Sequence, residues 1–306
     1  MQCPLCRELK RSSIEIISYA QIWSSLTTDL GATFTRDVIE RHTPALDVSL
    51  LECLNCGLQY FNPAVSGDAE FYSQLTSSVA AYYSAEKWDF QAAIQLIAPG
   101  DSVLDIACGG GSFLQLARAK GAEICGIDTN PAAVEEARKH DLPVHGLDLP
   151  EFAAKYPGRF DVVTAFQVIE HIPEVPPFVR SASACLKPGG KLLLTVPNRL
   201  RRFRAPFEPL DHPPHHLSRW TARQFQELAQ LIGLKLVAIR YEPGRMPDCR
   251  ALLRQWIAPV GQTESWWARA IARLAFGPSL YKIYAALGLL DRRLLRGMSV
   301  MAVLEK

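Results

Sequence analysis

The sequence predicts an α/β fold, a doubly wound and mostly parallel sheet, with a small cysteine-rich module in front of it. One observation is a short apolar run at residues 103–106, followed by three glycines and then by apolar residues at helical spacing. Another is the regular alternation of strand-like and helix-like segments from residue 101 to residue 196. Such alternation is typical of a sheet that binds its ligand at the carboxyl ends of the strands. Two C-x-x-C motifs before residue 60 indicate the separate module.

The composition is that of a globular protein with ample core. The 306 residues exceed one domain of roughly 100–200 residues, so a main domain with appendages is expected. Hydrophobic residues make up 48% and charged residues 21%, and a net charge of +2 does not favour a polyanion partner. We see neither a signal-peptide pattern nor an apolar run of membrane-spanning length. A cytoplasmic protein follows, whose eight cysteines would be thiols or metal ligands and not disulfides.

The segment V-L-D-I-A-C-G-G-G-S-F-L, residues 103–114, is the strongest signal in the chain. A glycine turn before a helix lets a ligand approach the backbone, and the helix N-terminus offers N–H groups. The dinucleotide fingerprint G-x-G-x-x-G does not fit, because Leu114 takes the place of its last glycine. Asp105 suits a cationic amine, and Asp128 suits the two hydroxyls of a ribose. S-adenosylmethionine (SAM) offers both groups and is the cofactor we expect.

These motifs resemble those of class I SAM-dependent methyltransferases. D-I-A-C-G-G-G at 105–111 resembles their motif I, D-x-G-C-G-x-G, with Ala107 where the family usually has glycine. F-D-V-V-T-A-F-Q-V-I-E-H at 160–171 resembles their fourth strand and its E-H ending, and L-K-P-G-G at 186–190 resembles the turn before their fifth strand. The resemblance runs from about residue 88 to the C-terminus. It implies a seven-stranded, Rossmann-like sheet with an antiparallel last strand. It also implies a set of SAM-binding residues: Asp105, Ala107, Cys108, Gly109, Gly111, Asp128, Thr129, Asp148 (near the adenine amine) and Gln167.

Each element of the predicted sheet has a local signal. Asn130 is a good helix cap, Pro131 suits the first helical turn, and Thr221 caps a later helix. The predicted strands are 103–106, 123–128, 142–146, 160–166, 191–196, 234–240 and 298–304, and the predicted helices are 88–98, 112–120, 131–140, 175–186 and 222–232. Tyr72, in the aromatic-rich stretch before the first of these helices, could cover the cofactor or substrate, as could Tyr82 and Tyr83, although simple packing is favoured.

The four cysteines near the N-terminus predict a structural zinc site. Cys3 and Cys6 form one C-x-x-C pair, Cys53 and Cys56 the other, and each pair can present two thiolates to one tetrahedral ion. The 46 residues between the pairs exceed the roughly 15–20 of a compact zinc ribbon, so an inserted subdomain is expected. A redox role is the alternative, but neither pair begins a helix after a strand. A zinc-ribbon-like segment before this fold also resembles a known group of bacterial methyltransferases.

We therefore divide the chain into a zinc-binding module at residues 1–65 and a methyltransferase domain at residues 66–306. Residues 243–292 are too long for a simple connection and predict an inserted helical unit. Within it, the amphipathic stretch 268–293 could contact a membrane surface, although packing into a core is favoured. The basic run at 199–204 could bind a phosphate, although a solvated loop is favoured.

Three histidines are candidates for a catalytic base. His171 follows the fourth strand, and His215 and His216 lie on the loop after the fifth, at the edge where the methyl group would be transferred. Capping of the next helix is the structural alternative for His215 and His216. His212, His215 and His216 could instead hold a metal ion, an interpretation supported by no nearby acid except Asp211.

The sequence thus predicts a SAM-dependent methyltransferase acting on a small molecule, such as a secondary metabolite, a sugar nucleotide or a lipid-linked acceptor. One alternative is an rRNA or tRNA methyltransferase with a zinc module. Against nucleic acid, we see no basic stripe and no aromatic in V-P-N at 196–198 that could stack on a base. The other alternative is a SAM-binding protein without catalysis, which the intact acids and glycines of the turn disfavour.

Overall fold

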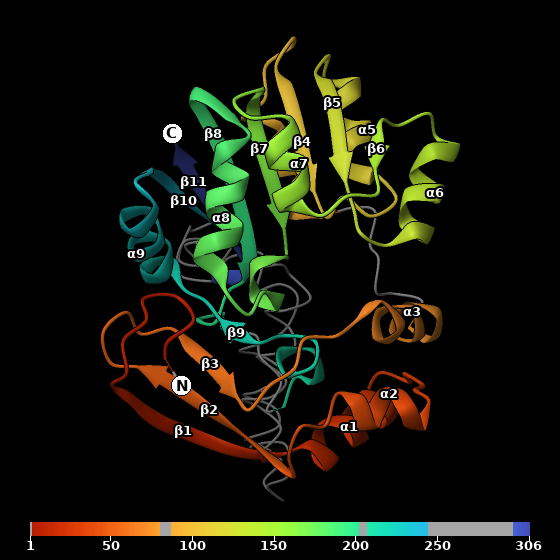
Figure 1. Cartoon of the computed structure of the whole chain (residues 1–306), viewed down its shortest axis with the longest axis vertical. Helices are drawn as coiled ribbons and strands as arrows, with labels where there is room; N and C mark the ends of the chain where they lie inside the picture. Colours follow the sequence, from red (N-terminus) through yellow and green to blue (C-terminus); the bar gives the residue numbers. More distant parts are fainter. Residues whose placement is uncertain (1, 80–86, 202–206, 244–295) are drawn as a thin grey trace, which may run out of the picture.

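A seven-stranded sheet forms the centre of the protein (Figure 1). The computed structural model describes residues 2–79, 87–201, 207–243 and 296–306. The sheet order is β10-β11-β8-β7-β4-β5-β6, with parallel pairing from β8 to β6 and antiparallel pairing of β11 with both neighbours. Its strands are β4 (Ser102–Ile106), β5 (Glu123–Ile127), β6 (Val144–His145), β7 (Phe160–Phe166), β8 (Leu186–Pro197), β10 (Lys235–Pro243) and β11 (Arg296–Glu305). The predicted fold class is confirmed.

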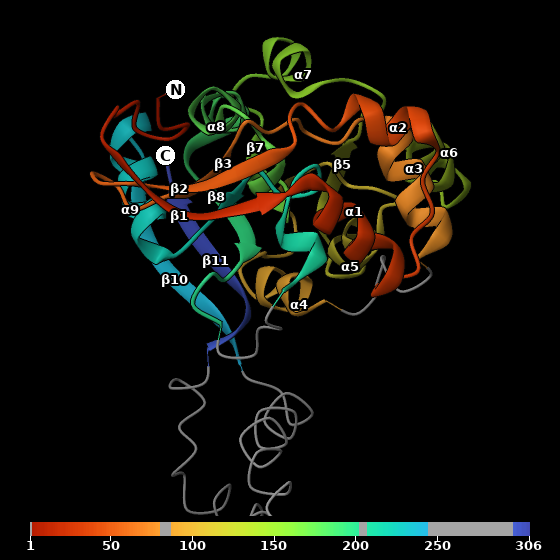
Figure 2. The ribbon, with the colours of Figure 1, turned by 90° about the horizontal axis from the view of Figure 1, so that it is seen from below.

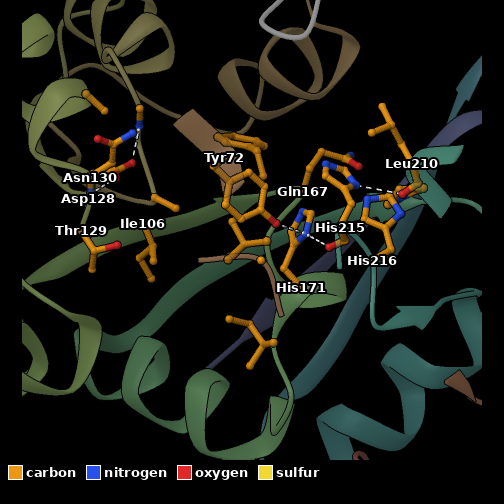
Figure 3. A pocket seen from close by; sticks show the side chains of 18 of the residues that line it. Tyr72, Ile106, Asp128, Thr129, Asn130, Gln167, His171, Leu210, His215 and His216 are labelled. Atoms are coloured by element: carbon orange, nitrogen blue, oxygen red, sulfur yellow. Dashed lines mark hydrogen bonds between the residues drawn. The ribbon is translucent and has the colours of Figure 1, made fainter. Parts of the chain in front are cut away.

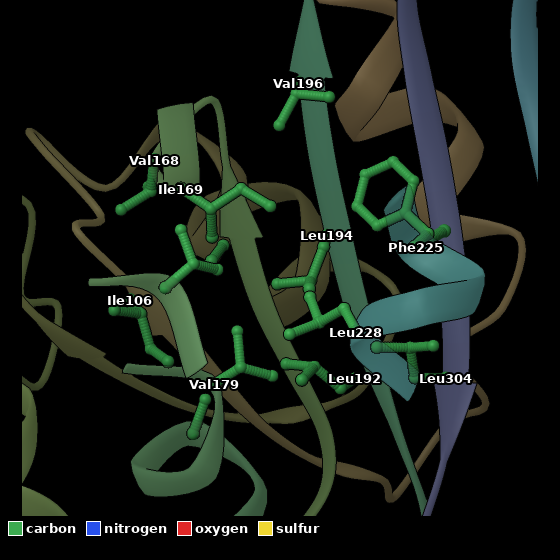
Figure 4. Packing of buried hydrophobic residues seen from close by; sticks show 14 of the residues in the cluster. Ile106, Val168, Ile169, Val179, Leu192, Leu194, Val196, Phe225, Leu228 and Leu304 are labelled. Atoms are coloured by element: carbon green, nitrogen blue, oxygen red, sulfur yellow. The ribbon is translucent and has the colours of Figure 1, made fainter. Parts of the chain in front are cut away.

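Helices cover both faces of this sheet (Figure 2). They are α4 (Trp88–Ile94), α5 (Ser112–Ala119), α6 (Pro131–Lys139), α7 (Leu149–Lys155), α8 (Val175–Ala184) and α9 (Ala222–Ile232). Leu192 and Leu194 of β8 face α8 and α9, where they pack with Phe225 (Figure 4), while Leu193 faces α4 and α5 on the opposite side. Alternate residues of a strand point to opposite faces, which explains why these central strands are apolar throughout.

The predicted helix starts are correct, and some predicted ends are not. The side chain of Asn130 accepts a hydrogen bond from the backbone of Ala132, and Thr221 forms a capping box with Gln224. The helix predicted at 88–98 ends at Ile94. The helix predicted at 175–186 ends at Ala184, because β8 begins at Leu186. The proline–glycine turn predicted before that strand is thus an irregular first part of it.

A second sheet lies against the carboxyl edge of the first, at the bottom of Figure 1. Its order is β1-β2-β3-β9, and all its pairs are antiparallel. Its strands are β1 (Arg11–Ser18), β2 (Asp47–Cys53), β3 (Gln59–Asn62) and β9 (Ser218–Arg219), and the associated helices are α1 (Tyr19–Thr28), α2 (Arg36–Arg41) and α3 (Ala69–Ser78). The predicted insert between the cysteine pairs is therefore folded, with its own apolar core around Trp23.

The core of this N-terminal part reaches beyond residue 65. Phe71 and Leu75 of α3 are fully buried in it. In addition, β9, which follows the last parallel strand β8 in the sequence, is the fourth strand of the N-terminal sheet. The division at residue 65 stays a prediction. The predicted helical unit at 243–292, Tyr82 and Tyr83 lie almost wholly outside the described residues. Among the helices that the structure describes, none is long and apolar enough to cross a membrane.

Candidate functional site

A cavity of about 820 Å³ lies where the carboxyl ends of the parallel strands face the N-terminal part (Figure 3). Ala107, Gly109 and Asp128 line one end, and three histidines line the other. Tyr72 of α3 also lines the cavity, although the sequence favoured simple packing for it. A ligand bound here would therefore contact residues of the N-terminal part as well as the loops at the carboxyl ends of the parallel strands.

The glycine turn after β4 requires left-handed backbone. Gly109 has φ +56° and Gly111 has φ +82°, values that glycine adopts without strain. A Cβ at Gly111 would also lie 2.2 Å from Cδ1 of Leu142. Ala107 adopts φ +57°, where a side chain costs on the order of 1–3 kcal/mol. The alanine in place of the family's glycine is therefore a strained residue, a larger departure than its size suggests.

Asp128 fixes this turn to the end of β5. One of its carboxylate oxygens accepts a hydrogen bond from the backbone N–H of Gly109, and the other accepts one from Asn130, both at 2.8 Å. Thr129 lines the cavity beside it. The carboxylate is thus held at the cavity wall by two backbone donors before any ligand binds.

Asp105 lies behind the wall that Ile106 and Ala107 form. It is 3% exposed, and Oδ1 accepts a hydrogen bond of 2.7 Å from the hydroxyl of Thr164. Burial raises the pKa of Asp105 to about 7. A cationic group brought near this carboxyl would favour its ionised form.

Three other predicted cofactor residues have different surroundings. Asp148 is exposed and accepts from the backbone of Glu151 at 2.9 Å as the cap of α7, so one of its oxygens is already used. Cys108 points its thiol toward Gly126, where a Cβ would lie only 2.7 Å from Sγ. Gln167 lines the cavity, but its amide donates to Asp89 at 2.8 Å. Whether these residues contact SAM stays a prediction.

Asp89 is a residue that sequence reasoning missed. It lies on the buried face of α4, is 3% exposed, and accepts hydrogen bonds from Gln167 and from Thr195 at 3.2 Å. Its Oδ1 has no hydrogen-bond partner among the described residues, and burial raises the pKa of its carboxyl. The sequence did contain a signal for Asp89, because it is an acidic residue on the apolar face of the helix predicted at 88–98.

His171, His215 and His216 converge at the far end of the cavity (Figure 3). One ring nitrogen of each lies within 4.8 Å of the others. His171 comes from a short 3-10 turn (Ile169–His171) after β7, and the other two come from the loop before β9. The sequence predicted that the three histidines lie at the same edge of the sheet. The structure adds that their rings are in direct contact.

Burial keeps these imidazoles neutral. It lowers the pKa of His171 to about 3, with His216 adding to the effect, and it lowers the pKa of His215 well below the usual value. Burial also lowers the pKa of His216, although the nearby Asp211 opposes this. Glu170, fully buried beside them, has its pKa raised well above the usual value by burial.

His212 does not belong to this cluster, which corrects the predicted grouping of His212 with His215 and His216. Its Nδ1 lies 2.7 Å from the carbonyl oxygen of Glu208, and its Nε2 lies 3.0 Å from the guanidinium of Arg219. His171, distant in sequence, takes its place.

The four predicted zinc ligands lie together. Sγ of Cys3 is 3.6 Å from Sγ of Cys56, Sγ of Cys6 is 3.5 Å from Sγ of Cys53, and all four sulfurs lie within 4.8 Å of one another. Three of these cysteines are buried. The geometry fits tetrahedral coordination of one ion. Four sulfurs, each about 2.3 Å from a central zinc, would be about 3.8 Å from one another, close to the separations seen here.

The cysteine cluster is docked on the start of α9. The side-chain amide of Gln224 donates to the carbonyl of Cys56 at 2.7 Å, and Arg223 donates to the carbonyl of Asn55 at 2.5 Å. Since Gln224 also completes the capping box of α9, the same side chain joins the cluster to the helix. The cluster therefore ties the chain's beginning to the parallel-sheet part.

The described part of the basic run at 199–204 forms internal ion pairs. Arg199 contacts Glu52 of β2 at 2.9 Å, and Arg201, 7% exposed, contacts Asp211 at 2.5 Å. The expectation of a solvated loop is wrong for these two residues. These two ion pairs hold the chain after β8 in place, one against β2 and the other against Asp211, just before the loop that carries His215 and His216.

Comparison with known proteins agrees with this geometry. The methyltransferase domain family matches residues 80–239, just over half of the chain. Ubiquinone biosynthesis O-methyltransferase of Xanthomonas campestris pv. campestris (strain B100) is 37% identical over 113 residues, which cover 35% of this chain and 47% of that protein. The namesake from Proteus mirabilis (strain HI4320) is 38% identical over 109 residues, covering 34% and 44%. The chain thus matches only about half the length of these relatives.

A solved structure supports the fold. The crystal structure of a SAM dependent methyltransferase from Archaeoglobus fulgidus superposes with a TM-score of 0.51 at 17% sequence identity. The superposition covers 71% of this chain and 91% of that one. The seven-stranded topology, the glycine turn closed by Asp128 and the family match over residues 80–239 together show that this chain belongs to the methyltransferase domain family, with the class I fold.

Proposed function

We propose that the protein is a SAM-dependent methyltransferase that methylates a hydroxyl oxygen of a small molecule. The observation that carries the proposal is one cavity with a nucleoside-type site at one end and a histidine cluster at the other. The relatives named O-methyltransferases support oxygen as the acceptor. The N-terminal part lines the cavity on the side of Tyr72, which favours a small acceptor over a nucleic acid.

SAM is itself a strong electrophile, so the protein mainly has to position the acceptor. Holding the acceptor oxygen in line with the methyl carbon and the sulfur supplies most of the acceleration. A hydroxyl must also lose its proton, and a group that accepts this proton has to lie within about 2.6–3.2 Å of the hydroxyl oxygen. His171, His215 and His216 line the cavity and are the side chains we assign to this step.

In the proposed complex, Asp128 accepts hydrogen bonds from the ribose hydroxyls. The amino-acid part of SAM lies against the backbone of the turn at Ala107 and Gly109. Backbone donors already hold Asp128 in place, which lowers the entropy cost of binding. We propose that Cys3, Cys6, Cys53 and Cys56 hold one structural zinc ion. Four thiolates leave no open position for water, so this site would not take part in catalysis.

The cofactor assignment is tested by Asp128→Asn. The amide can accept only one of the two backbone hydrogen bonds and carries no charge, so the charged acceptor for the ribose is lost. We expect SAM to bind about 10- to 100-fold more weakly, which corresponds to roughly 1.5–3 kcal/mol. Calorimetry measures the affinity, with Glu135→Ala, an exposed acid on α6, as the matched control. Equal affinity in Asp128→Asn and the parent would disprove the assignment.

Asp105 makes SAM binding pH-dependent. Its pKa of about 7 means that the carboxyl is partly protonated at neutral pH, whereas a bound ammonium favours the carboxylate. Binding therefore releases a proton, and affinity should rise up to about tenfold per pH unit between roughly pH 5 and pH 7, below the pKa of an α-amino group. Calorimetry in buffers of different ionisation enthalpy counts the proton. Asp105→Asn should bind with a flat profile, and an unchanged slope in that variant would contradict the assignment.

A further inference from the structure

The histidine cluster has the arrangement of a metal site. Outside the four cysteines, His171, His215 and His216 are the one group among the described residues whose ligand atoms all lie within 4.8 Å of one another. The ring centroids are separated by 4.8 Å, 4.9 Å and 4.3 Å. Three imidazoles this close, two of them on adjacent residues and the third from another strand end, need a physical reason.

The polar contacts of the three rings indicate which nitrogen of each carries the proton. Nδ1 of His171 lies 2.5 Å from the carbonyl oxygen of His215, and Nδ1 of His215 lies 2.9 Å from that of Leu210. Nδ1 of His216 faces the carboxylate of Asp211 at 3.5 Å. Because a carbonyl oxygen only accepts, Nδ1 of His171 and Nδ1 of His215 must carry the hydrogen, which leaves the lone pair of these neutral rings on Nε2. The hydroxyl oxygen of Tyr72, 2.9 Å from Nδ1 of His171, accepts from the same N–H. The nearby carboxylate of Asp211 favours the same tautomer for His216. Ligand histidines in proteins are oriented by this kind of hydrogen bond.

Glu170 supplies an independent observation. Its side chain has no exposed surface, and neither carboxylate oxygen has a hydrogen-bond partner among the described residues. Oε1 lies 3.8 Å from Nε2 of His171 and 3.9 Å from Nε2 of His216. A buried carboxyl without hydrogen bonds is costly, and a cation between these atoms would remove the cost.

We propose that His171, His215 and His216 bind a divalent first-row transition-metal ion through Nε2, with Glu170 as an oxygen ligand. Nitrogen-rich sites of this kind suit zinc, iron or manganese. An ion about 2.1 Å from each ligand would bring the nitrogens, now within 4.8 Å of one another, to roughly 3.4 Å, a contraction of at most about 1.4 Å. The histidines line the cavity and Glu170 does not, so a further coordination position would face the acceptor.

The role of this ion rests on the proposed function. Coordination of the acceptor hydroxyl lowers its pKa, and the proton passes to water. The oxygen then forms a bond to the methyl carbon of SAM while the carbon–sulfur bond breaks, and the sulfur keeps the bonding pair as a neutral thioether. Charge balances, since the positive charge of the sulfonium is replaced by that of the released proton.

The test is the metal content of the full-length protein, reloaded after chelation with zinc, iron(II) or manganese(II) in turn and then dialysed. We expect about two ions per chain from the metal that fits both sites, one at the cysteines and one at the histidines. His216→Gln and His171→Gln should each lower the content to about one ion. His140→Ala, which removes an exposed histidine at the end of α6, should leave about two. Circular dichroism and SAM affinity identify variants that have not folded.

A parent protein reloaded with zinc and then offered iron(II) or manganese(II) as well, which still holds no more than one ion of any kind per chain, would overturn the proposal, and so would an unchanged content in both glutamine variants. The parent stoichiometry decides the matter even if the variants do not fold. Failure of the proposed function has a different signature, in which the second ion binds but SAM does not, or SAM binds without methyl transfer to any acceptor.

Discussion

Cys53→Ser should lose the cysteine-bound zinc and unfold the N-terminal part of the protein at a much lower denaturant concentration than the parent. Cys53 is 1% exposed, and its thiolate would be one of four ligands with no substitute nearby. Loss of a structural metal is among the largest effects of a single substitution, on the order of 4–5 kcal/mol. Elemental analysis and denaturant unfolding followed by tryptophan fluorescence measure the two effects, since Trp23 lies in the N-terminal core.

Leu54→Ala is the matched control, because Leu54 lies between the cysteines of the same pair and is 61% exposed. It should keep both the zinc and the stability of the parent. Cobalt(II) exchanged into the site should show the charge-transfer absorption of thiolate ligands, which disappears in Cys53→Ser. Unchanged zinc content and an unchanged unfolding midpoint in Cys53→Ser would show that the four cysteines form only a packed thiol cluster.

His215→Ala and His216→Ala should each lower turnover by about 10²- to 10⁴-fold while SAM affinity is preserved. Both imidazoles line the cavity at the end remote from Asp128 (Figure 3). The effect is expected whether the rings take the acceptor's proton themselves or hold the ion that polarises the oxygen. Turnover is measured per SAM-binding molecule, with an acceptor identified by screening small molecules with labelled SAM.

A purely structural role has a different outcome. Both side chains are more than 90% buried, so their removal also costs stability, and the fraction of folded protein falls. If the molecules that still bind SAM turn over at the parent rate in both single variants and in the double variant, the histidines only shape the loop. His140→Ala again serves as the control for loss of a histidine.

The features that the sequence predicted correctly are those with local signals. The strands of the parallel sheet are apolar on both faces, the caps at Asn130 and Thr221 are adjacent to their helices, and the glycine turn follows its strand directly. Asp128 could be placed because the strand that precedes it fixes its edge of the sheet. The four cysteines could be grouped because metal chemistry demands it, although 46 residues separate the pairs.

The features that sequence reasoning missed depend on contacts between distant segments. The two-residue strand β9 is too short to have a periodicity, and only its pairing with β3 defines it. The sequence placed His171 at the same edge of the sheet as His215 and His216, but it did not predict their direct contact, in which Nδ1 of His171 meets the carbonyl oxygen of His215. Arg199 looks like part of a solvated basic run until its partner Glu52, on a strand 147 residues earlier, is known.

The loop that carries the histidines is held by main-chain hydrogen bonds from both halves of the protein. Leu217 donates to the carbonyl of Glu170 in the parallel-sheet part, while its own carbonyl accepts from Phe61 of β3, and Gly67 donates to the carbonyl of Pro214. The histidine end of the cavity is therefore shared between the two parts of the protein, whereas the turn at Gly109 is fixed by Asp128 within the parallel-sheet part alone. A substitution in the N-terminal part that weakens these main-chain contacts should shift the histidine loop and leave the glycine turn in place.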